Sequence, residues 1–196
     1  TVFRYTTTNA IALNATVPGS YVVTDATTNT AFTTARNRWS GGILSGVLLL
    51  NNPTDGLFWW NGNTATDFQK FGVVSYVSDV ARVFDNFIVQ LAPTMSGTKY
   101  GRRVLWSDAA EPGAIPTSFV SSTTNEAGYV DLTGEDGVLI DCLPYGGANI
   151  LFTESGRYAM RYQPGSEAVF GFTRLPGDDG AVGMNCVVNT PRGQVF

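Results

Sequence analysis

Between Gly137 and Val188 the chain is a series of short apolar runs separated by turn-forming residues. The runs are rich in Val, Ile, Tyr and Phe, while Gly, Pro, Asp and Ser gather between them. This pattern is typical of antiparallel strands joined by tight turns. It predicts strands at 137–143, 149–153, 157–162, 168–174 and 184–188. Taken alone, this stretch indicates a fold class and no function.

The same pattern extends upstream, where apolar runs predict strands at 43–50, 57–60, 68–74, 80–84, 86–91, 102–107 and 129–132. Asn61-Gly62 and Asp85-Asn86 are hairpin signals. A helix fits best at 78–90, but the β-branched and aromatic residues there, together with Asp85-Asn86, favour a hairpin. Proline at 112 and 116 excludes a regular element at 108–119. We therefore predict an all-β fold.

Units of four short strands repeating at about 45 to 50 residues are typical of β-propeller blades. We predict a single β-rich region over 1–196, with peripheral strands and loops at 1–40 and blade-like meanders at 41–196. The peripheral part is rich in Thr and Asn and contains candidate strands at 10–13 and 21–24 and a turn at 17–20. Three or four blades are too few for an ordinary propeller. The start at Thr1 and the strand-like end at 193–196 add to the expectation of a larger propeller protein.

Composition narrows the possible functions. Only 14% of the residues are charged and the formal net charge is −4, which fits a protein covered by partners and argues against a basic surface that grips nucleic acid. The sequence contains no histidine, so Ser-His and Cys-His nucleophile pairs and the commonest zinc ligand are excluded. No apolar run approaches the length of about 18 residues needed to span a membrane as a helix; the longest, 42–50, predicts a buried strand.

Several residues are candidates for function. Cys142 and Cys186 lie in apolar runs, which favours two buried thiols, with a disulfide as the alternative. Acidic residues at 131, 135, 136, 141, 178 and 179 and the Arg102-Arg103 pair suggest no defined catalytic, metal or nucleic-acid site, and we expect no cofactor. Aromatic and arginine residues are the candidates for an interface or a channel lining: Trp59, Trp60, Arg157, Tyr158, Arg161 and Tyr162.

Three segments carry a resemblance to a known family: 103–116, with the pattern W-S-x-A-x-x-P-G-x-I-P, then 125–132, and 149–162 followed by 169–172. With 185–188, and with 58–62 and 82–89 upstream, their order resembles the tail nozzle or tail tube proteins of short-tailed bacteriophages, over about residues 40 to 196. The resemblance implies a β-propeller in a homo-oligomeric ring around the DNA exit channel, located in the virion. It also implies other tail proteins as partners, such as an adaptor, fibres or spikes, and transient passage of double-stranded DNA. It brings no catalytic residues.

Two other hypotheses remain open. A carbohydrate-binding β-domain would use Trp59 and Trp60 as a sugar platform for attachment to a host surface. A hydrolase built on a β-propeller would need a pair of carboxylates, with Asp141 as a candidate.

Overall fold

The computed structural model describes residues 3–5, 23–25, 38–63, 66, 68–72, 75–166 and 168–196. Every regular element in this part of the chain is a β-strand, and every pair of strands is antiparallel. The predicted all-β class is therefore confirmed. The candidate strand at 10–13 and the turn at 17–20 lie outside the described residues, and the candidate at 21–24 overlaps a strand at its end.

Three antiparallel meanders follow one another along the chain. The first contains β3 (Ser40–Leu44), β4 (Val47–Asn52), β5 (Gly56–Trp60) and β6 (Gln69–Lys70). The second contains β7 (Val77–Phe84), β8 (Phe87–Met95), β10 (Arg103–Trp106) and β11 (Gly128–Asp131), with β9 (Thr98–Lys99) paired to β8. The third contains β12 (Leu139–Tyr145), β13 (Ala148–Thr153), β14 (Arg157–Tyr162) and β15 (Phe170–Arg174). Separate hairpins join β1 (Phe3–Tyr5) to β2 (Val23–Asp25) and β16 (Val188–Thr190) to β17 (Gly193–Val195).

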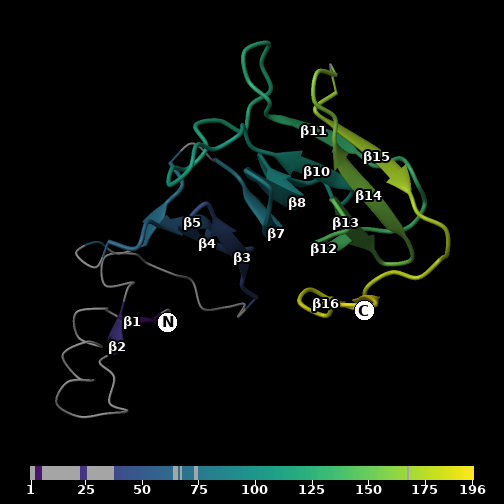
Figure 1. Ribbon diagram of the computed structural model, residues 1–196, viewed down its shortest axis with the longest axis horizontal. Helices are drawn as coiled ribbons and strands as arrows, with labels where there is room; N and C mark the ends of the chain where they lie inside the picture. Colours follow the sequence, from purple (N-terminus) through teal and green to yellow (C-terminus); the bar gives the residue numbers. More distant parts are fainter. Residues whose placement is uncertain are drawn as a thin grey trace.

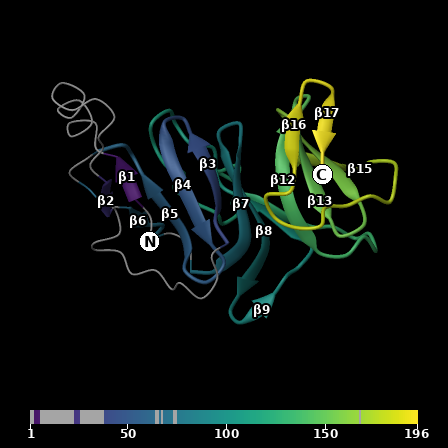
Figure 2. The same cartoon turned by 90° about the horizontal axis from the view of Figure 1, so that it is seen from below.

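The three sheets radiate from a common centre (Figure 1). The first strand of each sheet lies at that centre, with β7 in contact with both β3 and β12. The later strands of each sheet lie progressively farther out, and β11 and β15 are among the outermost (Figure 1). The C-terminal hairpin lies beside the third sheet (Figure 2), where β16 contacts β12. Thus β16 lies next to β12 much as β12 lies next to β7.

Apolar side chains fill the space between neighbouring sheets. The cluster between the first and second sheets includes Leu49, Leu57, Ile88 and Leu105. The cluster between the second and third sheets has these buried members: Val80, Phe84, Phe87, Val89, Leu91, Val104, Trp106, Leu132, Leu139, Cys142, Leu151, Tyr158, Met160 and Phe170. Full burial of one such Leu or Phe side chain contributes about 2 to 3 kcal/mol. Burial between sheets therefore supplies most of the stability of the fan.

Each of the three sheets begins with a hairpin whose two strands are separated by only two residues. The connecting pairs are Ser45-Gly46, Asp85-Asn86 and Gly146-Gly147. Ser45, Gly46, Asp85 and both glycines have positive φ, the backbone conformation that favours tight hairpin turns. The prediction of one strand over 43–50 is therefore wrong. Ser45-Gly46 interrupts this apolar run and turns it into the hairpin β3–β4.

Three other boundaries differ from prediction. Asn61-Gly62 does not form a two-residue hairpin, because the next strand, β6, begins only at Gln69. Residues 93–101, between the strands predicted at 86–91 and 102–107, contain the end of β8 and all of β9. The predicted strand at 184–188 is a turn at 184–185 and irregular at 186–187, and only Val188 belongs to a strand. Asn185 has a φ of 65° and its backbone N–H is bonded to a carboxylate, so that N–H is not available for a sheet.

Replacing Gly46 with Ala tests the turn between β3 and β4. Gly46 has a φ of 93° and open space around the position of a Cβ atom, so the cost is backbone strain alone, about 1 kcal/mol of unfolding free energy. Urea denaturation measures this loss. Gly72→Ala is the matched control, because Gly72 also has open space and no positive φ. Equal effects of the two substitutions would contradict the assigned turn.

Candidate functional site

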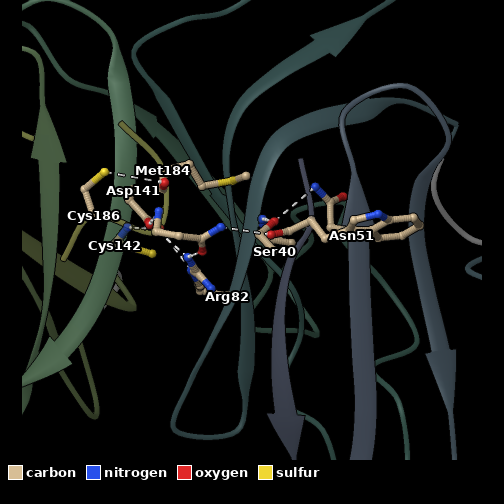
Figure 3. A network of polar contacts seen from close by, with 10 residues as sticks. Ser40, Asn51, Arg82, Asp141, Cys142, Met184 and Cys186 are labelled. Carbon is tan, nitrogen blue, oxygen red and sulfur yellow. Dashed lines mark hydrogen bonds and ion pairs between the residues drawn. The ribbon is translucent and has the colours of Figure 1, made fainter. Parts of the chain in front are cut away.

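The second and third sheets are joined at the centre of the fan by a buried ion pair (Figure 3). Arg82 on β7 donates from Nε and Nη2 to the two carboxylate oxygens of Asp141 on β12, at 2.9 and 2.8 Å. The side chain of Asp141 is 3% exposed and that of Arg82 is 17% exposed. Two-point contact between guanidinium and carboxylate fixes orientation as well as distance. Each charge therefore requires its partner on the neighbouring sheet.

Asn185 completes this contact from the segment that leads into β16. Its backbone N–H donates to Asp141 Oδ2 at 2.8 Å, and its side-chain Oδ1 accepts from Arg82 Nη2 at 2.6 Å. Its Nδ2 donates to the carbonyl of Trp39 at 3.2 Å, just before β3. Asn185 thus contacts the approach to the first strand of the first sheet and the first strands of the second and third sheets.

A second set of buried polar groups joins the first and second sheets. Ser40 Oγ accepts from the backbone N–H of Ala81 at 3.0 Å and from Asn51 Nδ2 at 3.4 Å. Asn51 Nδ2 also donates to the carbonyl of Ser78 at 3.1 Å. Ser40, Asn51 and Ser78 are each at most 3% exposed, and buried polar groups need such partners. We call the residues Ser40, Asn51, Ser78, Arg82, Asp141 and Asn185 the central polar network.

The two cysteines have different surroundings. Cys142 is fully buried beside Asp141, and burial raises the pKa of its thiol to about 12, so the thiol stays protonated at neutral pH. Cys186 is exposed and, like Cys142, is a free cysteine. The expectation of a buried thiol is therefore confirmed for Cys142 and wrong for Cys186. Cys186 lies in the turn that Asn185 creates and not in a strand, so its apolar neighbours in the sequence do not enclose it.

Trp59 and Trp60 lie on opposite faces of β5, as successive strand residues do. Trp59 packs against the cluster between the first and second sheets, and Trp60 against Phe58 and Phe68 on the other face. Trp60 Nε1 donates to the carbonyls of Asn63 and Thr66, both at 2.9 Å. The two rings are half-buried and do not form a common platform.

The residues predicted on β14 also divide between two faces. Tyr158 is 7% exposed within the cluster between the second and third sheets, and its hydroxyl donates to Asp136 at 2.6 Å. Tyr162 lies at the edge of this cluster, 40% exposed, and donates to Glu126 at 2.8 Å. On the other face Arg157 pairs with Asp179 at 2.8 Å, and Arg161 is exposed. Together with Trp59 and Trp60 on the first sheet, these residues do not form a single site.

A second charged cluster lies at the outer strands of the third sheet. Arg174 on β15 donates from Nε and Nη2 to Asp136, at 2.9 and 2.7 Å, and its Nη2 also contacts Asp178 at 2.9 Å. Hydrogen bonds from Arg174 and from Tyr158 lower the pKa of Asp136 from 3.8 to about 2. This cluster links β15 to the turn that precedes β12. From the sequence, the two carboxylates of this cluster are recognisable only as acidic residues in turns.

Sequence reasoning missed the central polar network, although the sequence contains a signal for it. Arg82 stands alone in an apolar run of β7, and Asp141 stands alone in an apolar run of β12. Lone charges in buried strands need a partner of opposite sign. Asp141, the carboxylate considered for hydrolysis, has both oxygens bonded to Arg82 and accepts further bonds from the backbone N–H groups of Cys142 and Asn185.

The described residues contain no group of three or more Cys, Asp or Glu side chains arranged to hold a metal ion. They also contain no helix long and apolar enough to cross a membrane. A scan against protein-family models finds no match. A search of the curated proteins finds no relative.

Replacing Asp141 with Asn tests whether the central ion pair holds neighbouring sheets together. The change keeps the shape and leaves Arg82 without a countercharge, so we expect a loss of about 3 kcal/mol in unfolding free energy. Asp79→Asn is the matched control, because the Asp79–Lys99 pair is much more exposed and is expected to contribute at most about 1 kcal/mol. Urea denaturation measures both losses. Equally small losses of unfolding free energy in the two variants would contradict a central role for the Arg82–Asp141 pair.

The lowered pKa of Asp136 predicts acid sensitivity. Because this carboxylate has a lower pKa in the folded state, its stabilising contribution is complete above the unfolded value of 3.8 and is lost as the pH falls toward about 2. We expect Asp136→Asn to flatten the dependence of unfolding free energy on pH across this window. Urea denaturation at a series of pH values measures this dependence in both proteins. The same slope in both proteins would show that Arg174 does not stabilise the Asp136 carboxylate.

Proposed function

We propose that this chain is a structural component of a short-tailed phage tail nozzle, forming part of a β-propeller in a homo-oligomeric ring through which DNA leaves the virion. The observation that carries the proposal is the fan of three consecutive antiparallel meanders, of four, five and four strands, with their first strands at a common centre. Successive radiating sheets that bury apolar faces against each other are the arrangement of propeller blades. The resemblance of 103–116, 125–132 and 149–162 to nozzle proteins supplies the biological role.

The C-terminal hairpin supports continuation of the propeller beyond three sheets. Its strands are separated by two residues, 191–192, as in the first hairpin of each meander. Asn189 donates to the carbonyl of Pro144 at 2.8 Å and Gln194 to that of Leu143 at 3.1 Å, which fixes the hairpin beside β12. The form of the hairpin and its position beside β12 support the proposed propeller.

Exposed apolar side chains on this hairpin support association with other chains. Val188 and Val195 are partners across the hairpin and are 58% and 61% exposed. Val182 nearby in the sequence is 93% exposed. Permanent assemblies use apolar contacts of this kind, and a chain with only 14% charged residues has few charges to oppose them. The net charge of −4 is also compatible with a passage that does not retain DNA.

Light scattering and native mass spectrometry of the purified protein test the assembly. We expect defined multiples of the 21.0 kDa chain. The double variant Val188→Asp/Val195→Asp should shift the population toward monomer, because charges do not tolerate burial in an apolar contact. Val120→Asp is the matched control, since Val120 is 72% exposed on a loop distant from the hairpin in sequence.

A monomer at all concentrations would contradict the proposed ring. Equal disruption by Val120→Asp would show that the effect is one of added charge and that the hairpin is not the contact. Immunogold labelling of phage particles tests the location separately, with the label expected at the tail tip. Label confined to the capsid would contradict the proposed role.

A further inference from the structure

A groove opens on the outer side of the fan, between the second and third sheets. It has a volume of about 320 Å³, within the range of pockets that hold small ligands. One wall is formed by Ser121, Ser122 and Asn125 from the loop between β10 and β11, and the other by Ala168 and Val169 before β15. The two loops project side by side from the fan (Figure 1).

The floor of the groove is aromatic and fixed in place. Trp106 and Phe170 lie with their rings nearly perpendicular at a centroid distance of 5.3 Å, and Trp106 and Phe172 are 5.9 Å apart. The indole Nε1 of Trp106 donates to the carbonyl of Glu126 at 2.8 Å. Phe172 is only partly buried, so part of its ring is available to a ligand.

The polar wall is held by bonds within its own loop. Asn125 Oδ1 accepts from the backbone N–H of Ser122 at 3.1 Å, and Asn125 Nδ2 donates to the carbonyl of Val120 at 3.0 Å. Asp108 Oδ1 accepts from the backbone N–H of Glu126 at 3.0 Å. The hydroxyl of Ser121 is exposed and makes no hydrogen bond to any described residue. It remains available as both donor and acceptor.

The groove is uncharged wherever the structure describes it. The described residues of its lining include no Asp, Glu, Lys or Arg. Glu126, next to the polar wall in sequence, accepts a hydrogen bond from Tyr162 at 2.8 Å. Glu167, between Ser166 and Ala168, lies outside the described residues. The described part of the lining offers no countercharge to a phosphate, a carboxylate or a cation, so it does not favour an ionic ligand.

We propose that this groove binds a neutral saccharide. A sugar ring has a C–H face that packs on an aromatic ring and a rim of hydroxyl groups that both donate and accept hydrogen bonds. The groove presents the matching parts: the partly exposed ring of Phe172, held against the buried Trp106, and the hydroxyl of Ser121 on a wall shared with Ser122 and Asn125. This site is separate from Trp59 and Trp60, and it does not depend on the proposed ring.

Calorimetric titration with three uncharged sugars, maltotriose, cellotriose and chitotriose, tests the proposal. We expect at least one to bind with a dissociation constant of about 1 mM or below. Ser121→Trp places an indole in the groove mouth and should abolish binding. Ser155→Trp is the matched control, because Ser155 is also exposed but lies at the β13–β14 turn, at the other end of β14 from the groove.

A second variant leaves the entrance of the groove open and removes one aromatic ring from its floor. Phe172→Ala should weaken binding by about tenfold or more, and the unfolding transition of each variant shows whether it is folded. The proposal is overturned if none of the three sugars binds, or if Ser121→Trp and Ser155→Trp bind equally. If an uncharged peptide binds and none of the sugars does, the groove is a protein-docking groove, and the proposal is again overturned.

Discussion

The fan of sheets depends on the two-point contact between Arg82 and Asp141, completed by Asn185. Apolar burial between the sheets supplies most of the free energy, but it is non-directional and tolerates sliding. A buried ion pair adds little net stability and a strong geometric requirement, because each charge is costly without its partner. The clusters therefore hold the sheets together, while the central polar network determines their relative position.

The two surfaces to which we assign proposed roles lie away from the centre of the fan. The outer strands of the second and third sheets lie away from the common centre, and the groove opens there between β10–β11 and β15. The same arrangement leaves the β16–β17 hairpin at the end of the series, with Val188 and Val195 exposed. The proposed assembly contact and the proposed saccharide groove thus lie on different surfaces of the fan.

Much of the fold could be predicted from local patterns, because strands and tight turns depend on neighbouring residues. The hairpin around Asp85-Asn86 and the strands at 149–153 and 157–162 are confirmed. The apolar content of 43–50 predicts one strand there, and the prediction is wrong because Ser45-Gly46 forms the turn between β3 and β4. The candidate site was harder to predict. Arg82, Asp141 and Asn185 are far apart in sequence, and only the packing of different sheets brings them together. Exposure of Cys186 likewise depends on the turn at Asn185.

Hydrogen exchange on the Asn185→Gly variant tests the central claim most directly. Glycine retains the backbone conformation at a φ of 65° and removes the side-chain bonds to Arg82 and Trp39. Our account predicts faster amide exchange in β3, β7 and β12 together, because the side chain of Asn185 bonds to Arg82 on β7 and to Trp39 before β3, and Arg82 in turn pairs with Asp141 on β12. Faster exchange confined to residues 181–187, with the three strands unchanged, would show that Asn185 secures only its own turn and would contradict the account.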